Sequence, residues 1–242
     1  MRVPRLFVDM PLASDSEIQL DAGSANHLLK VLRLRPGAPL LLFNGAGGEY
    51  RAVLGLSKSG VVSIGAFSDR EAESPLDLCL AQGISRGERM DYTVQKAVEL
   101  GVTEIVPLST ERCGVVLDGA RMEKRVQHWQ RVAQSACAQC GRNRVPRVSA
   151  VNCLSAWLDS VEGRRLVLHP QATVGLAAIE PATDITLLIG PEGGLSDAEL
   201  AMARHAGFTP VHLGPRVLRT ETAAVVALSI IQALWGDLAA GA

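Results

Sequence analysis

The residues best suited to chemistry lie in two glycine-containing stretches near the end of the chain. Gly190-Pro191-Glu192-Gly193-Gly194 directly follows Asp184–Ile189, a short apolar run that is typical of a buried strand. A second loop, Gly214–Arg219, follows another expected strand at Thr209–Leu213. Because ligands bind beyond the carboxyl ends of strands in open α/β sheets, the two loops predict one shared binding site.

The second loop also brings charged side chains together. Arg216, Arg219 and Glu221 surround a turn whose other neighbours are apolar, which indicates a polar ligand. A carboxylate can accept a proton, and an arginine can stabilise negative charge as it develops. Two plainer interpretations remain open. Glycine and proline are expected in any β–α turn, and Glu221 is also an acid favoured by the dipole of the helix that it begins.

Beyond residue 70 the sequence alternates between strand-like and helix-like segments, which predicts a largely parallel sheet covered by helices on both faces. Local signals mark the helix ends. Ser196 and Glu199 form a predicted capping box, Gly207 ends the same helix, and Thr220 is expected to cap the last one. The expected strands are 76–81, 103–108, 147–151, 165–169, 185–189 and 210–213, and the expected helices are 89–100, 121–140 and 221–238.

The first 70 residues are rich in strand-like segments, and the polar stretch 68–75 is the best linker in the chain. Gly45-Ala46-Gly47-Gly48 is predicted to be a hairpin turn rather than a nucleotide loop, because a strand follows it where a helix would be required. The expected strands are 5–8, 39–44, 49–54 and 60–66, with a short helix at 27–32.

Charge is distributed unevenly over a chain of 242 residues whose net charge is only −1. Lys30, Arg33 and Arg35 form one basic patch, and the segment 121–147 forms a second, with Glu123 as its only acid. Such patches on a neutral protein suit a polyanion such as RNA. The alternative is that each patch is simply a solvated helix face.

Several classes of protein are disfavoured by what the sequence lacks. The chain has no P-loop, dinucleotide fingerprint or GxSxG elbow in a suitable context. Five cysteines without an export signal predict reduced thiols and a cytoplasmic protein. Cys137 and Cys140 have CxxC spacing but no second pair, so no metal is predicted. No apolar run is long enough to span a membrane.

The two loops carry a resemblance. Gly190-Pro191-Glu192-Gly193-Gly194 together with residues 213–223 resembles the bacterial small-subunit (16S) ribosomal RNA uridine-N3 methyltransferases of the SPOUT superfamily. Pro215 departs from the residue that is usual there. Weaker similarities extend the match over the whole chain, at residues 5–8, 27–33, 96–102 and 139–142.

The resemblance implies a fold and a partner. We expect a PUA-like β-barrel that binds RNA at residues 1–70, and an α/β methyltransferase domain at 71–242. In that domain the sheet would be largely parallel, and the C-terminal part of the chain would be tied in the trefoil knot of the SPOUT type. The cofactor would be S-adenosylmethionine, and the substrate a uridine in the 16S rRNA of the small ribosomal subunit. The family is dimeric, so a homodimer is also expected.

The resemblance also implies roles for individual residues. Arg142, Arg219 and Glu221 are the candidate catalytic residues, and His169 is expected to shape its loop rather than act as a base. At Gly190, Gly193 and Gly214, the absence of a side chain is expected to leave space for the ligand. The candidate cofactor-binding residues are Leu168, His169, Ile189, Gly190, Pro191, Glu192, Gly193, Leu213, Gly214, Arg216, Val217, Leu218, Arg219 and Thr222. The candidate RNA-binding residues are Arg5, Lys30, Arg33, Arg131 and Arg142.

Two other functions stay open from the sequence. The chain could be a SPOUT methyltransferase acting on a different RNA base or on a ribose, or a non-catalytic RNA-binding assembly factor. Methylation at uracil C5 through a cysteine nucleophile is disfavoured, because no cysteine lies in either loop.

Overall fold

The computed structural model describes residues 3–56, 60–114 and 119–238, and it divides into two compact units. The first unit comprises residues 1–73 together with 137–145, and the second comprises 74–136 together with 146–242. The end of helix α3 (Gly119–Cys140) and the loop after it therefore group with the N-terminal residues, which the linear order of the chain did not predict.

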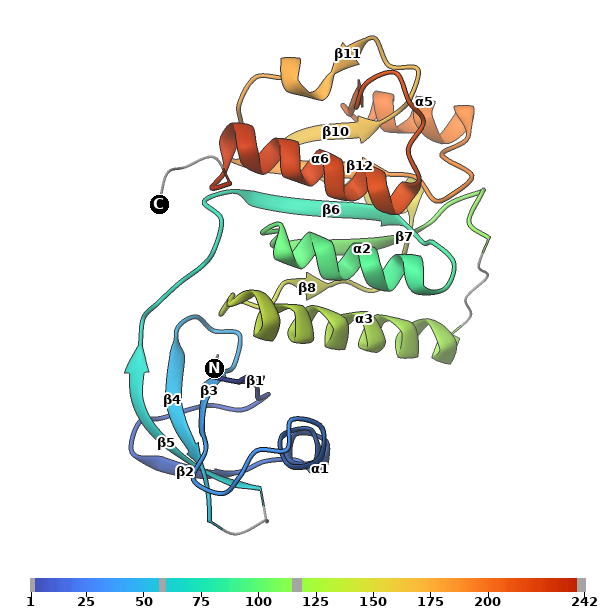
Figure 1. Cartoon of the computed structure of the whole chain (residues 1–242). Coiled ribbons are helices and arrows are strands. Elements are labelled where there is room, and N and C mark those ends of the chain that lie inside the picture. The colour runs from blue at the N-terminus through green and yellow to red at the C-terminus, as the bar shows by residue number, and fades with distance from the viewer. Residues whose placement is uncertain (1–2, 57–59, 115–118, 239–242) are drawn as a thin grey trace. The chain divides into compact units, whose positions relative to one another are not determined.

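The first unit is built on a five-stranded sheet (Figure 1). Its order is β1-β3-β4-β5-β2, in which β1 pairs in parallel with β3 and the other pairs are antiparallel. Alternate side chains of the strands face a core that includes Leu6, Leu40, Leu54 and Ile64. The strands are β1 (Arg5–Phe7), β2 (Ser16–Gln19), β3 (Pro39–Phe43), β4 (Glu49–Leu54) and β5 (Val61–Ser68).

The short helix expected at 27–32 is the second half of a longer helical segment. Helix α1 (Ala22–Asn26) begins after Asp21, whose carboxylate accepts hydrogen bonds from the N–H groups of Gly23 and Ser24. A π-helical turn, η1 (His27–Val31), continues it. The segment ends near Arg33, whose φ of 53° lies in the left-handed region.

The second unit contains an eight-stranded sheet in which every strand pair is parallel, as the strand–helix alternation predicted. The order is β11-β13-β10-β12-β6-β7-β8, and β9 also pairs with β7. The strands are β6 (Asp77–Gly83), β7 (Glu104–Ser109), β8 (Arg147–Val148), β9 (Asn152–Cys153), β10 (Arg164–Leu168), β11 (Val174–Gly175), β12 (Asp184–Ile189) and β13 (Thr209–His212).

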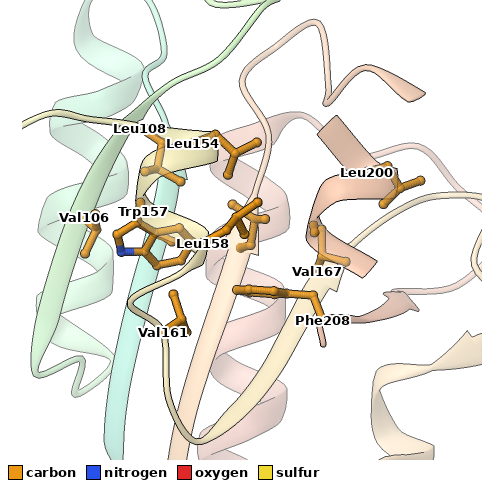
Figure 2. Close-up of a cluster of buried hydrophobic side chains, with 12 residues drawn as sticks. Val106, Leu108, Leu154, Trp157, Leu158, Val161, Val167, Leu200 and Phe208 are labelled. Carbon is orange, nitrogen blue, oxygen red and sulfur yellow. The ribbon is translucent and has the colours of Figure 1, made fainter. Parts of the chain in front are cut away.

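Helices cover both faces of this sheet. On one face, α2 (Glu88–Glu99) and α6 (Thr220–Trp235) pack against each other (Figure 1). On the other face, α4 (Leu154–Leu158) and α5 (Asp197–His205) cover an apolar cluster that includes Trp157 and Phe208 (Figure 2). A short 3₁₀ turn, η2 (Leu176–Ala178), follows β11. Strands buried on both faces explain the continuous apolar runs of the sequence.

The capping box at Ser196 and Glu199 is present, but the predicted cap of the last helix is wrong. Arg219 occupies the N-cap position of α6, and its side chain makes no capping hydrogen bond. Thr220 is the first helical residue, and its hydroxyl is used elsewhere, as described below. The elements that the sequence analysis missed are all five residues or fewer: β2, α1, β9, α4, β11 and η2.

Candidate active site

Three loops at the carboxyl edge of the parallel sheet surround one cavity of about 810 Å³. The loops follow β10, β12 and β13, and these strands are neighbours in the sheet. The structure therefore brings together the candidate cofactor-binding residues, except for Thr222, which is exposed and does not line the cavity. The predicted residues that line it are Leu168, His169, Ile189, Gly190, Pro191, Glu192, Gly193, Leu213, Gly214, Arg216, Val217, Leu218, Arg219 and Glu221.

Buried hydrogen bonds tie two of the loops together. The Thr220 hydroxyl donates to the Gly190 carbonyl oxygen at 2.7 Å. The side-chain amide of Gln82, at the end of β6, donates to the Thr220 hydroxyl at 3.0 Å and to the same Gly190 oxygen at 3.3 Å. Gln82 is fully buried, so these bonds are shielded from water. They fix the start of α6 against the loop after β12.

The three glycines are needed for different reasons. A Cβ at Gly190 would lie 2.8 Å from the Leu195 nitrogen, and a Cβ at Gly193 would lie 2.9 Å from the Arg112 Cβ. At these two positions, space for a cofactor is therefore not the reason for glycine; close packing of the protein is. Gly214 has a φ of 104° and open space around its Cβ position, so here the backbone conformation requires glycine.

Hydrogen bonds and ion pairs link Arg86, Arg89, Glu192 and Glu221 beside the cavity. Arg89, on the first turn of α2, donates from Nη1 to Glu192 Oε1 at 2.8 Å, and its Nε lies 3.8 Å from Glu221 Oε1. The Arg86 N–H donates to the same Glu192 oxygen at 2.9 Å. Partial burial opposes ionisation of Glu192, but the hydrogen bonds from Arg86 and Arg89 outweigh it and hold the pKa of Glu192 below its ordinary value.

Two polar atoms on residues that line the cavity have no hydrogen-bond partner. They are Oε2 of Glu221 and Nδ1 of His169, and both are inaccessible to solvent. Buried polar atoms are normally paired, so orphaned ones at a cavity indicate that a ligand or water supplies the missing partner. Glu221 therefore lines the cavity with one unpaired carboxylate oxygen, which is covered in this structure.

Arg112, which the sequence analysis did not single out, supports the loop after β12. Its Nη1 donates to the carbonyl oxygens of Gly193 and Leu195 at 3.1 and 3.2 Å. The neighbouring Glu111 N–H donates to Glu199 Oε1 at 2.8 Å. The sequence placed Arg89 and Arg112 after expected strands, but it carried no signal for the strand order that brings them to the cavity. They follow β6 and β7, whose carboxyl ends meet the same edge of the sheet.

Arg216 and Arg219 are exposed on the loop after β13. Neither guanidinium forms an ion pair or hydrogen bond within the described parts of the chain. Val217, between them, is 80% exposed. The rim of the cavity therefore presents two positive charges without internal counter-charges, which suits an anionic ligand.

The remaining predicted residues lie on the first unit and on α3. Lys30, Arg33 and Arg131 are exposed. Arg142 is 4% exposed, and its Nε and Nη2 each lie 2.7 Å from Glu73 Oε2. Arg5 is held by Glu49 and by the loop after α3, at the Arg142 carbonyl and the Asn143 side chain. Burial lowers the pKa of Arg5, and the nearby Glu49 opposes this shift.

Among the residues that the structure describes, no group of three or more His, Cys, Asp or Glu side chains could hold a metal ion. Cys137 is buried within the last turns of α3, and its thiol contacts the Arg144 carbonyl oxygen. In the same described ranges, no helix has the length and apolar character needed to cross a membrane.

Comparison with known proteins gives the class to which this fold and cavity belong. Residues 72–232 match a family described as RNA methyltransferase domain, and residues 20–63 match one described as RNA methyltransferase PUA domain. The strands that build the cavity all lie within the first of these matches. The second unit therefore contains an RNA methyltransferase domain.

Full-length relatives make the assignment more specific. Ribosomal RNA small subunit methyltransferase E of Buchnera aphidicola (strain APS) is 32% identical, over 98% of this chain and 95% of that protein. The Mycobacterium bovis protein of the same name is 34% identical, over 94% and 90%. The chain belongs to the ribosomal RNA small subunit methyltransferase E family.

Solved structures agree with this membership. The Neisseria gonorrhoeae family member bound to S-adenosyl methionine is 39% identical with a TM-score of 0.90, covering 98% of this chain and 100% of that one. A methyltransferase of Legionella pneumophila, solved with bound SAM, is 40% identical with a TM-score of 0.95 and the same coverage. Both similarities extend over the strands and loops that form the cavity.

Proposed function

We propose that this protein transfers a methyl group from S-adenosylmethionine to N3 of a uridine in 16S rRNA of the small ribosomal subunit. The observation that carries the proposal is the cavity at the carboxyl ends of β10, β12 and β13, with the free Oε2 of Glu221 at its wall. Membership of the ribosomal RNA small subunit methyltransferase E family supports the target, and the cofactor-bound relatives support the methyl donor.

The three loops are well suited to hold S-adenosylmethionine. A volume of about 810 Å³ lies within the range of small-molecule sites. The loop backbones after β12 and β13 offer N–H and C=O groups, and Leu168, Ile189 and Leu218 offer apolar surface. When bound, this cofactor supplies a methyl group activated by its sulfonium charge.

The residues of the chain have two tasks in the transfer. Uridine N3 carries a proton at neutral pH, and its lone pair attacks the methyl carbon only as that proton is lost. Glu221 Oε2 accepts the N3 proton, which is general-base catalysis, while Arg219 stabilises negative charge on the uracil oxygens. The sulfonium becomes a neutral thioether as the N3–methyl bond forms, so the charges balance.

RNA binding is assigned to exposed cations. Lys30 and Arg33 in residues 1–70, and Arg131 on α3, form no ion pair with any residue that the structure describes, so they can reach phosphates without losing one. Arg142 and Arg5 stay predictions, since the Glu73 carboxylate already engages Arg142 and Glu49 engages Arg5. On this proposal, residues 1–70 form the RNA-binding domain and residues 71–242 the methyltransferase domain.

The proposal extends to the knot, the dimer and a cytoplasmic location. In the sheet, β13 lies on the side of β10 opposite β12, whereas α6, which follows β13, packs against α2. The loop between β13 and α6 therefore crosses over the sheet, and hydrogen bonds of Thr220 and Gln82 hold it against the loop after β12. This path is compatible with the trefoil knot that the family resemblance implies. Helix α6 carries half-exposed Val225, Val226 and Ile230, and Leu234 is 50% exposed. An exposed apolar face of this kind suits contact with a second copy of the chain, which supports a homodimer.

The cofactor assignment can be tested by calorimetry with the Gly214→Val variant. Valine at a φ of 104° is strained, and its side chain would enter open space at the cavity. We expect at least about tenfold weaker S-adenosylmethionine binding, or about 1.4 kcal/mol. Gly37→Val is the matched control, because Gly37 also has a positive φ and open space but lies in residues 1–70. Equal losses in both variants would contradict the assignment.

The reaction itself can be tested with small subunits that lack the modification. Purified protein and methyl-labelled S-adenosylmethionine should transfer label to the 16S rRNA. Cofactor and RNA binding without any transfer would instead support a non-catalytic assembly factor.

A further inference from the structure

Arg89 bridges two carboxylates that come from different loops of the cavity. Its Nη1 donates to Glu192 Oε1 at 2.8 Å, and its Nε lies 3.8 Å from Glu221 Oε1. The three side chains start from the first turn of α2, the loop after β12 and the first turn of α6. A single planar guanidinium therefore links three elements that the sheet brings together.

Glu192 is the fixed end of this arrangement. It accepts the Arg86 N–H at 2.9 Å in addition to Arg89, and both bonds favour its ionised form. The two interactions of Arg89 are unequal, since the contact with Glu192 is 1.0 Å shorter than the contact with Glu221. Arg89 is 44% exposed in its side chain, so the pair contributes orientation more than stability.

The Glu221 carboxylate has fewer partners than that of Glu192. One oxygen faces Arg89, and the other, Oε2, is inaccessible to solvent and has no partner. The terminal torsion of a glutamate is broad, so an unrestrained carboxylate would rotate among many orientations. The Arg89 guanidinium, 3.8 Å from Oε1, attracts that oxygen, so Oε2 is the carboxylate oxygen that has no partner.

We propose that Arg89 is a positioning residue for methyl transfer: anchored by Glu192, it orients Glu221 so that Oε2 accepts the uridine N3 proton. This inference rests on the proposed function. It also gives Glu192 a new role as the anchor of Arg89 in place of the predicted cofactor contact. When Glu221 takes up the proton, Arg89 keeps Glu192 as its counter-charge, so the proton transfer leaves no unpaired cation.

The competing account is that Arg89 binds an RNA phosphate directly. A phosphate contact would add to RNA affinity, and its loss would reduce the salt dependence of binding. A positioning role predicts neither effect. It predicts instead that Arg89 matters only while Glu221 can accept the proton.

A double-mutant cycle separates the two accounts. Single-turnover rates are measured at saturating RNA and S-adenosylmethionine for wild type, Arg89→Gln, Glu221→Gln and the double variant. We expect Arg89→Gln to lower the rate roughly 10- to 100-fold, and the double variant to be no slower than Glu221→Gln alone. Arg89→Lys should recover part of the rate, since an ammonium can hold one carboxylate but not two. Lys96→Gln, which removes a charge from the same helix at its Glu99 pair, is the control and should retain the wild-type rate.

The possible results lead to different conclusions. Multiplicative losses in the double variant would overturn the proposal. Weaker RNA binding with a shallower salt slope in Arg89→Gln would also overturn it, and would assign Arg89 to a phosphate. Unchanged RNA and cofactor affinities with non-additive rates would support it. If wild-type protein transfers no methyl group to any RNA, the proposed function itself fails.

Discussion

Glu221 has two features that bear on its role: its carboxylate can accept a proton, and it stands at the start of a helix. It lies on the first turn of α6, so the dipole of the helix favours its carboxylate, and it also faces the cavity. The two interpretations of this residue in the sequence are therefore compatible. The unpartnered Oε2 is the observation that favours chemistry over a purely structural role.

Glu221→Gln should slow the single-turnover methyl transfer by about 100-fold or more, because an amide cannot accept the N3 proton. Cofactor affinity should change little if the carboxylate acts mainly in the transition state. Glu99→Gln is the matched control, since Glu99 pairs with Lys96 on α2 and does not line the cavity. A Glu221→Gln rate within a few-fold of wild type would contradict the assignment.

The cysteines should differ sharply in reactivity. Burial, and then Glu104, raises the pKa of Cys79 to about 12, and burial raises that of Cys137 to about 12. Hydrogen bonds from Ser155 lower the pKa of the exposed Cys153. At pH 8, iodoacetamide should therefore label Cys153 at least about a hundredfold faster than the other two. Peptide mass spectrometry measures this, and equal labelling would contradict it.

The same raised pKa values predict a pH dependence of stability. Cys79 and Cys137 are neutral thiols in the folded chain, while unfolded thiols ionise near their ordinary pKa of 9.0. The contribution of these two neutral thiols to the free energy of unfolding is fully present below pH 9 and is lost as the pH rises from 9 towards 12. The midpoint of urea unfolding should fall over that interval.

Prediction at the residue scale is possible where local spacing carries the information. The loops at Gly190–Gly194 and Gly214–Arg219 are recognisable because their residues are consecutive. Arg89 was missed because its partners, Glu192 and Glu221, are over a hundred positions away. Only the order of strands in the sheet brings it to the cavity, and no local pattern encodes that order.

At the scale of elements, α5 depends on its N-terminal cap. The Ser196 hydroxyl accepts the Glu199 N–H at 3.2 Å, and Glu199 Oε2 accepts the Ser196 N–H at 2.8 Å. Glu199 Oε1 also holds the Glu111 N–H, so the cap links two loops beside the cavity. The capping box could be predicted because it needs only two residues at a fixed spacing.

Ser196→Ala should lower the free energy of unfolding by about 1 kcal/mol, because a buried N–H loses its acceptor. Ser135→Ala on the exposed surface of α3 is the control, and should be neutral or slightly stabilising. Urea unfolding midpoints measure both. A Ser196→Ala protein as stable as wild type would contradict the energetic role of the cap.

The misplaced cap of α6 has a physical explanation. Thr220 has the residue type and the spacing of a cap, but its hydroxyl is buried against Gly190 and Gln82. A tertiary hydrogen bond between distant loops has taken the group that local reasoning assigned to the helix end. The short elements β9, β11 and α4 were missed because so few residues carry no readable periodicity.

At the scale of the whole molecule, uneven charge should control RNA binding. Because the net charge is −1, we expect affinity to come from local patches such as Lys30 and Arg33. RNA affinity should fall steeply with salt, and Arg33→Gln should reduce the logarithmic slope by about 0.7 to 0.9. Arg51→Gln, an exposed residue on β4, should leave the slope unchanged. Salt-independent affinity would point to a protein partner instead.

The sequence predicted the α/β class and the parallel sheet, because strand–helix alternation is a long-range pattern that is repeated along the chain. The regrouping of residues 137–145 with the N-terminal unit could not be predicted in this way. It depends on ion pairs such as Arg142–Glu73, between residues that are distant in sequence. The periodicity of the sequence does not reveal a knot or a homodimer, so both are inferred from the family resemblance and belong to the proposed function.

The most direct test of the central claim is nucleotide-resolution mapping of 16S rRNA by mass spectrometry, with and without this protein in the same cells. The account predicts one uridine that carries a methyl group on N3 when the protein is present and none when it is absent or carries Glu221→Gln. A methyl group on ribose or on carbon C5, or unchanged 16S rRNA, would contradict it.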